Sequence, residues 1–276
     1  MLETIAVTGA TGQVGRELVR YLQQNNIDNR LLVRDLKKAS LLAHPSSRLV
    51  SFDYRKSETY APALKSANRL FLVCDILLVA EAESLLNSAK EAGIKQIVMM
   101  SGIGADKSKI HALARLEKIV EASGIPYIAL RANWFFQNFG SFFREMVTDK
   151  RELSFPDAKT PISFVDSRDI AEVAFYFLTH PIPQSTAYDI TGPESLTHQD
   201  VADLFSKHLP YKVTYKQLSE KEAKEELGWD DEWLHLFKDI RDGFASQVSN
   251  SVQKILERTP RRFETYILEN RSLWIS

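Results

Sequence analysis

Short apolar runs alternate with amphipathic segments over the first 130 residues of this 276-residue chain. The runs have the length of buried strands, and the segments between them carry apolar residues at helical spacing. The expected strands are 4–8, 30–34, 48–52, 69–74, 96–101 and 127–131, and the expected helices are 13–24, 35–43, 58–66, 79–92 and 109–123. Such alternation predicts an α/β fold with a doubly wound parallel sheet that is buried on both faces.

The pattern changes after residue 131. An aromatic-rich stretch at 133–143 predicts a helix that continues to about residue 147, and the apolar run 162–165 predicts a strand. Residues 187–190 fit a strand that returns to the main sheet. The rest of the chain is mostly helical in pattern, with one further strand expected at 212–217.

The chain is longer than one average domain but short for two independent ones. We therefore expect a Rossmann-type, doubly wound parallel sheet with a small, mostly helical C-terminal lobe. The NAD(P)-binding core would comprise 1–133 with return elements near 166–191. The smaller substrate lobe would comprise 134–165 and 192–276.

Charge and composition exclude several classes of protein. A formal net charge of -1 and a pI near 6.6 argue against binding to nucleic acid or to a membrane surface, since either favours a basic excess. The most apolar segment, 70–80, is interrupted by Asp75 and is too short to span a bilayer. Cys74 is the only cysteine, which excludes an intrachain disulfide and, with scattered histidines, argues against a metal site. The first expected strand begins at residue 4, which leaves no room for a signal peptide. Together with the single cysteine, this predicts a cytoplasmic protein.

Glycines spaced three apart separate the first strand from the first helix. Gly9 permits a tight turn, Gly12 lets a diphosphate approach the backbone, and Gly15 lets the helix pack closely on the strand. The start of the helix adds unpaired N–H groups and a partial positive charge. This arrangement predicts a dinucleotide pyrophosphate site, with a plain strand-to-helix turn as the alternative. The residues expected to contact the cofactor here are Thr8, Gly9, Thr11, Gly12, Gln13, Val14 and Gly15.

The end of the second strand bears on the choice of cofactor. Arg34 stands where the adenosine ribose lies in this architecture, and Lys38 follows closely. Because a guanidinium suits a 2′-phosphate, we predict NADP(H) rather than NAD(H). Asp35 lies about twenty residues after Gly15 and keeps an NAD interpretation open. Arg34 could alternatively be a solvated charge beside an Asp35 that caps the next helix.

Further candidates lie at the ends of later strands, where such sheets bind ligands. Cys74 either lines the cofactor site or is a buried, inert thiol. Ser101 either contacts cofactor or substrate or caps a turn. Aromatic density after the sixth strand suits a flat ring stacked over a nicotinamide, or else a packing wedge between the lobes. The substrate-binding residues expected there are Asn133, Trp134, Phe135 and Phe136.

Several collinear segments resemble atypical short-chain dehydrogenases/reductases, and as a set they resemble the NmrA-like family. These segments are 7–15, 32–34, 92–98, 101–106, 123–127, 130–139, 164–171 and 188–194. The tail, 241–274, is similar to bacterial members akin to ergot-alkaloid dehydrogenases. The resemblance implies an NADP-binding Rossmann domain and a cleft beside a small lobe for a quinone, an imine or another small electrophile. Some relatives are NADPH-dependent reductases, and others are redox-sensing regulators with little or no catalysis.

The chain departs from the wider superfamily at the usual Tyr-x-x-x-Lys pair. That pair is expected within 107–117, which contains no tyrosine. His111 and Arg115 share a helix face there and form a possible acid–base pair, the alternative being a half-exposed histidine beside a surface arginine. The missing tyrosine affects ordinary carbonyl reduction more than quinone or iminium reduction. Hydride delivery to those polarised acceptors depends mainly on positioning, and solvent could supply the proton.

Together these features predict an NADPH-dependent oxidoreductase that transfers hydride to a quinone, imine or similar small planar acceptor. The protein would be a monomer or a homodimer. The alternative is an NADP(H)-binding, redox-sensing regulatory protein that acts on a protein partner. A sugar-nucleotide epimerase is disfavoured because the tyrosine–lysine pair is absent.

Overall fold

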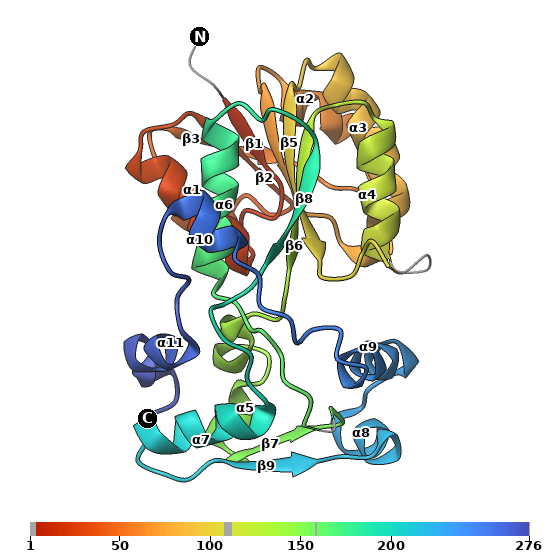
Figure 1. The fold of residues 1–276 in the computed structure, drawn as a ribbon. Coiled ribbons are helices and arrows are strands. Elements are labelled where there is room, and N and C mark those ends of the chain that lie inside the picture. Colours follow the sequence, from red (N-terminus) through yellow and green to blue (C-terminus); the bar gives the residue numbers. More distant parts are fainter. Residues whose placement is uncertain (1–3, 108–111, 158, 276) are drawn as a thin grey trace. The chain divides into compact units, whose positions relative to one another are not determined.

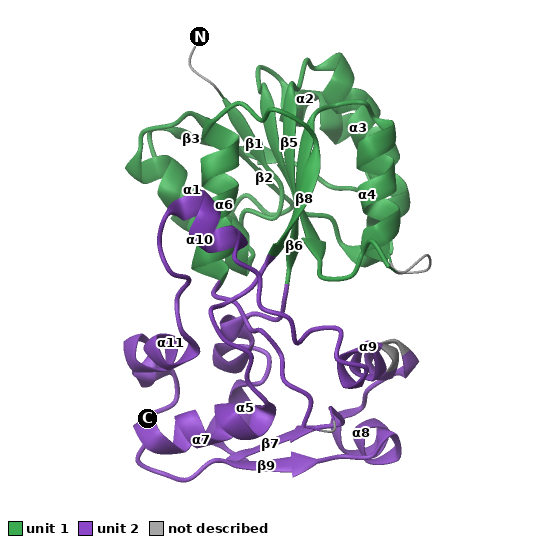
Figure 2. Cartoon of the chain, in the orientation of Figure 1, with its two compact units in different colours: residues 1–132, 167–189 green, residues 133–166, 190–276 purple. Residues whose placement is uncertain are grey.

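The computed structural model describes residues 4–107, 112–157 and 159–275. The chain forms two compact units (Figure 2). Unit 1 comprises residues 1–132 and 167–189, and unit 2 comprises residues 133–166 and 190–276. Within the described ranges, no helix combines the length and the apolar character needed to cross a membrane.

Unit 1 is built on a seven-stranded sheet in the order β3-β2-β1-β4-β5-β6-β8 (Figure 1). Its strands are β1 (Ile5–Val7), β2 (Asn29–Val33), β3 (Ser47–Ser51), β4 (Arg69–Leu72), β5 (Gln96–Gly102), β6 (Tyr127–Ala132) and β8 (Thr186–Ile190). Neighbouring strands from β3 to β6 pair in parallel. The chain reverses its direction of travel across the sheet between β1 and β4, so ligands are expected at this switch point. The predicted doubly wound α/β sheet is confirmed, and so is the return of 187–190 to it.

Helices cover both faces of this sheet. They are α1 (Gln13–Gln24), α2 (Tyr60–Leu64), α3 (Val79–Glu91), α4 (Ala112–Ala122) and α6 (Ser167–Thr179), with 3₁₀ turns η1 (Lys38–Leu42), η2 (Ser57–Thr59) and η3 (Ile76–Leu78). Helices α1 and α6 pack together on one face, and α2, α3 and α4 form a row on the other (Figure 1). Successive strand residues serve opposite faces. Ala6 joins the core beneath α2 to α4, while its fully buried neighbours Ile5 and Val7 point to the other side.

Unit 2 is mostly helical around a small parallel pair of strands, β7 (Glu152–Phe155) and β9 (Thr214–Gln217). Its helices are α5 (Arg144–Thr148), α7 (His198–His208), α8 (Glu220–Leu227), α9 (Asp231–Arg241), α10 (Ser251–Leu256) and α11 (Phe263–Glu269), with 3₁₀ turns η4 (Phe136–Gly140) and η5 (Arg271–Leu273). Aromatic side chains dominate the core of this unit, with Phe139, Phe155 and Phe205 fully buried.

A buried polar array ties the strands of unit 2 to α7. Asp157, which has no exposed surface, accepts hydrogen bonds from His198 Nδ1 and from the Tyr215 hydroxyl. Burial alone would raise the pKa of Asp157, but the hydrogen bond and charge of His198, together with Tyr215, hold it below its ordinary value. The array therefore stabilises unit 2 in a way that depends on the ionised carboxylate.

The strand expected at 162–165 is wrong. Three N–H groups in this run donate to carbonyl oxygens on three separate segments. These bonds join Ile162 to Leu196, Ser163 to Ala245 and Val165 to Trp134, at 2.8, 2.9 and 2.8 Å. Because no single partner runs alongside, the segment makes isolated bridges instead of a strand.

Two expected helices are shorter than the pattern suggested. The helix expected at 35–43 is only the 3₁₀ turn η1. The helix expected from 133 to about 147 is interrupted between η4 and α5, where Ser141 leaves the helical region (φ -131°, ψ -88°). Gly140, just before this break, lies so close to the Tyr266 hydroxyl that an added Cβ would meet it at 2.6 Å.

Candidate cofactor and acceptor site

The glycine turn after β1 curls tightly against the start of α1. Gly9 has a positive φ of 62°, and the Gly12 N–H donates to the Gly9 carbonyl at 2.9 Å. A Cβ added at Gly15 would lie 2.0 Å from that same carbonyl oxygen, and one at Gly12 would lie 3.2 Å from it. The backbone at Gly15 therefore fits no larger residue without moving.

This turn leaves the N-terminus of α1 open to a ligand. Gly12 is the extended N-cap residue, it is exposed, and it carries no side chain to cap the helix. The first amide groups of α1 and the helix dipole then face the turn. These residues fit the pyrophosphate of a dinucleotide, which needs close backbone approach and N–H donors.

Other residues predicted around this turn contribute mainly through the backbone. The Thr8 side chain is fully buried, with its hydroxyl 3.1 Å from the carbonyl oxygens of Phe71 and Val73, and it accepts from the Val73 N–H at 2.6 Å. Thr8 thereby holds the ends of β1 and β4 in place at the switch point. Val14 is also buried, whereas Thr11 is exposed.

The end of β2 presents free positive charge. Arg34 and Lys38 are exposed, and within the described part of the chain no carboxylate forms an ion pair with Arg34. Asp35 Oδ1 accepts from the backbone N–H groups of Lys37 and Lys38 at 2.9 and 3.1 Å. One oxygen of Asp35 is thus engaged by the backbone, while the side chains of Arg34 and Lys38 stay exposed to an anionic ligand.

Cys74 lies just beyond β4 as a buried thiol. Its Sγ lies 3.4 Å from the carbonyl oxygens of Asp75 and Leu78. Burial, followed by the neighbouring Asp75 charge, raises the pKa of Cys74 to about 12. The thiol therefore stays protonated at neutral pH and is a poor nucleophile.

Ser101 belongs to a polar array that the sequence did not reveal. Its Oγ donates to Glu117 Oε1 of α4 at 2.5 Å. Arg131 of β6 binds the same carboxylate through two atoms, Nε at 2.9 Å and Nη2 at 2.7 Å. These hydrogen bonds raise the pKa of Arg131 above its ordinary value. The array lies at the carboxyl ends of β5 and β6, where Ser101 and Arg131 are partners in the parallel register.

The predicted acid–base pair is not placed by this structure. His111 lies outside the described residues, and Arg115 is an exposed residue of α4. The role assigned to His111 stays a prediction.

The residues predicted to shape a substrate wall begin unit 2 and differ in exposure. Asn133 is buried, and its amide nitrogen donates to Ser163 Oγ at 2.7 Å and to the Ala245 carbonyl at 2.8 Å. Phe136 is buried too, whereas Trp134 and Phe135 are half-exposed. Trp134 and Phe135 are thus the two whose rings are accessible in part.

Trp134 borders a set of stacked rings that we call the aromatic ladder, formed by Phe142, Trp233 and Trp229. Phe142 stacks on Trp233 with ring centroids 5.6 Å apart and planes 13° from parallel. Trp233 stacks on Trp229 at 5.3 Å and 24°. Phe142 is 66% exposed, so its ring cannot be covered on both faces. The outer face of Phe142, at the end of the aromatic ladder, is therefore the flat apolar surface that a planar ligand could cover.

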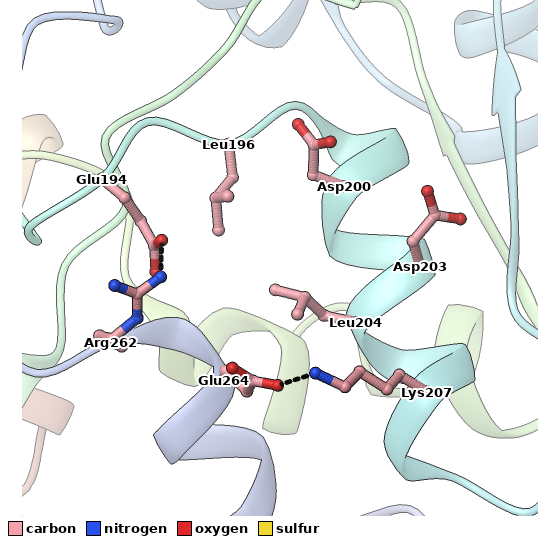
Figure 3. A pocket seen from close by; sticks show the side chains of 8 residues that line it. All are labelled: Glu194, Leu196, Asp200, Asp203, Leu204, Lys207, Arg262 and Glu264. Atoms are coloured by element: carbon pink, nitrogen blue, oxygen red, sulfur yellow. Dashed lines mark hydrogen bonds and ion pairs between the residues drawn. The ribbon is translucent and has the colours of Figure 1, made fainter.

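A separate pocket of about 320 Å³ lies in unit 2 (Figure 3). Leu196 and Leu204 form its apolar part, and charged groups surround them (Figure 3). Arg262 pairs with Glu194 at 2.5 Å, and Lys207 pairs with Glu264 at 2.7 Å. Because carboxylates of the pocket already engage both cations, neither is available for the phosphates of a dinucleotide.

The fold and the glycine turn are those of a Rossmann-type dinucleotide-binding protein. Residues 1–267 match the model of the NmrA-like family, and the chain belongs to this family. It is 29% identical over 275 residues to an NAD(P)H azoreductase of Xenophilus azovorans, with 95% of this chain and 96% of that protein covered.

Solved structures show the same fold. An NADPH-dependent quinone oxidoreductase from Escherichia coli, complexed with NADPH, superposes with a TM-score of 0.85 at 23% identity, covering 96% of this chain and 99% of that one. NmrA, a negative transcriptional regulator in complex with NADP, superposes with a TM-score of 0.78 at 19% identity, covering 98% and 96%. The fold is thus common to reductases and to a regulator.

Proposed function

We propose that this protein is an NADPH-dependent oxidoreductase that reduces planar acceptors such as quinones or azo compounds. The observation that carries the proposal is the close packing of the glycine turn, residues 9–12, on the start of α1, which we call the cofactor cradle. An added Cβ at Gly15 would lie 2.0 Å from the Gly9 carbonyl oxygen. So close an approach of helix to turn serves the binding of a pyrophosphate. The relative that is an NAD(P)H azoreductase supports the reaction class.

Two features favour NADPH over NADH. Arg34 is exposed at the end of β2, where the adenosine ribose lies in this fold. Asp35, which would favour NADH by binding the ribose hydroxyls, uses one carboxylate oxygen to accept from the backbone N–H groups of Lys37 and Lys38. The guanidinium of Arg34 would bind the 2′-phosphate.

Bound NADPH would supply the hydride, and the residues of this chain would position the reactants. In unit 1, the amides of α1 would hold the pyrophosphate of the cofactor. In unit 2, the exposed ring of the aromatic ladder is a candidate stacking surface for a planar acceptor. Because 107–117 contains no tyrosine, the proton for the reduced acceptor would come from solvent or through His111.

Turnover and binding assays test the proposal. We expect NADPH oxidation, followed by absorbance, in the presence of menadione or an azo dye. Arg34→Ala should weaken NADPH binding by about tenfold to a hundredfold, consistent with the loss of a charge pair, and leave NADH binding unchanged. Arg48→Ala, which removes an exposed guanidinium within β3, serves as the matched control.

Each arm has a result that would contradict the proposal. Tighter binding of NADH than of NADPH would contradict the cofactor assignment. Tight NADP⁺ binding without turnover on a panel of quinone, azo and imine acceptors would instead favour the redox-sensing regulator.

A further inference from the structure

We propose that Ser101 accepts a hydrogen bond from the carboxamide NH₂ group of the bound nicotinamide, and that Glu117 and Arg131 are positioning residues that fix its hydroxyl for this task. This inference rests on the proposed function. It assigns to Ser101 the role of acceptor toward the cofactor, not of proton donor toward the substrate.

The order of the strands directs the nicotinamide toward Ser101. The pyrophosphate lies at α1, which follows β1, and the adenosine lies toward β2. An extended dinucleotide must then continue to the other side of β1, across the carboxyl ends of β4 and β5. Ser101 is the penultimate residue of β5, so it lies at this edge of the sheet.

The hydrogen-bond inventory of the hydroxyl defines what it can bind. A serine hydroxyl has one donor hydrogen and two acceptor lone pairs. The hydrogen is committed to Glu117 Oε1 at 2.5 Å, so only lone pairs remain for a ligand. A quinone oxygen or an azo nitrogen offers lone pairs and no hydrogen. The nicotinamide carboxamide, by contrast, carries an NH₂ donor at the reacting end of the cofactor.

The ion pair holds the hydroxyl in this orientation. Two parallel hydrogen bonds from Arg131 fix the plane of the Glu117 carboxylate, and the side chains of Arg131 and Glu117 are only 17% and 12% exposed. Water therefore competes weakly for these groups, and hydrogen bonds to a charged partner are the stronger kind. Rotation of the Ser101 hydroxyl toward a ligand would break its bond to the carboxylate.

A cofactor analogue isolates the proposed contact. In 3-acetylpyridine adenine dinucleotide phosphate, a methyl group replaces the carboxamide NH₂. Calorimetry on the full chain should show that the wild type binds NADP⁺ about tenfold more tightly than the analogue. Ser101→Ala should weaken NADP⁺ binding by about that factor and leave analogue binding unchanged, whereas Ser101→Thr, which keeps a hydroxyl, should retain the preference.

The positioning residues are tested by the same ratio of affinities. Glu117→Gln should reduce the preference for NADP⁺ without weakening analogue binding. If Glu117 has a purely structural role, Glu117→Gln should lower the thermal stability or weaken the binding of both nucleotides together. The ratio of the affinities for NADP⁺ and the analogue would then stay unchanged. Glu226→Gln breaks the exposed pair with Lys216 in unit 2 and is the matched control, expected to change neither affinity.

The outcomes separate this inference from the proposed function. The role of Ser101 would be overturned if the wild type bound NADP⁺ and the acetylpyridine analogue with equal affinity. It would also be overturned if Ser101→Ala weakened the binding of both nucleotides equally, or of neither. A preference that persists in Glu117→Gln would overturn the role of the ion pair. A wild-type protein that binds neither nucleotide would overturn the proposed function itself.

Discussion

Replacing Gly15 with alanine tests the cofactor cradle directly. An ideal Cβ at Gly15 lies 2.0 Å from the Gly9 carbonyl oxygen, whereas ordinary contacts begin at 3.4 Å. The glycine turn and the first turn of α1 must therefore separate by about 1.4 Å, the difference between these distances. Both groups are backbone, so no side-chain rotation relieves the clash.

This separation should weaken the binding of NADP⁺ more than it lowers the stability of the fold. The amides of α1 and the turn act on one pyrophosphate, and a displacement of about 1 Å in groups that position a substrate can cost on the order of a hundredfold in rate. We expect the Kd for NADP⁺ to rise at least about tenfold in Gly15→Ala. Overpacking costs about 1–3 kcal/mol, so the melting temperature should fall by several degrees.

Calorimetric titration with NADP⁺ measures the affinity, and Gly93→Ala provides the control. Gly93 has a φ of 82° with no atom within 4 Å of its added Cβ, so alanine there is strained by about 1–2 kcal/mol far from the cradle. The control should melt earlier and bind NADP⁺ normally. Unchanged affinity in Gly15→Ala would refute the cradle, and equal losses in both variants would show that stability alone controls binding.

Three further outcomes follow from the structure. With its pKa raised to about 12, Cys74 should react with iodoacetamide at pH 8 about a thousandfold more slowly than in the unfolded chain; comparable rates would contradict its burial. His198 holds the pKa of Asp157 below its ordinary value, against the effect of burial. The ionised carboxylate therefore stabilises the folded protein at pH values above about 4, the pKa of an aspartate in an unfolded chain, and this stabilisation is lost as the pH falls through the lower pKa of the folded state. Asp157→Asn should therefore be less stable than the wild type at pH 7, and chemical denaturation should show the difference narrowing below about pH 4; a difference independent of pH would exclude the carboxylate charge as its cause. Phe142→Ala should raise the KM for azo dyes of two or more rings about two- to tenfold without changing the Kd for NADP⁺. Leu268 is a comparably exposed apolar residue, and Leu268→Ala should change neither constant. An unchanged KM in Phe142→Ala would rule out stacking on the aromatic ladder.

Local patterns were sufficient to predict the sheet of unit 1. Each of its central strands is buried on both faces, so an apolar run marks it regardless of its neighbours. Strand β7 escaped prediction because only four residues form it, between Arg151 at a φ of 51° and Pro156, and its partner β9 lies far along the chain. The bridges at 162–165 depend on three distant segments, which no local pattern specifies.

In the candidate site, too, the part built from contiguous residues was predictable and the part built from distant residues was not. The glycine turn was predictable because strand, turn and helix are contiguous in sequence. Glu117 and Arg131 were not, because their meeting with Ser101 depends on the β5–β6 register and on the packing of α4. A helical projection of α4 combined with the parallel register would have placed the three side chains together.

The helix after β5 thus has a chemistry that differs from that of a Tyr-x-x-x-Lys helix. Within its described residues it supplies a carboxylate, Glu117, that accepts from Ser101 and pairs with Arg131. The hydroxyl hydrogen of Ser101 and two donor groups of Arg131 are directed at this carboxylate, so the array serves to orient groups. Under the proposed function, we expect such a site to suit acceptors that take up hydride readily without a proton donor at the same moment, as quinones do. Ordinary ketones and aldehydes, which need a proton donor at the oxygen as hydride arrives, are the less favoured acceptors.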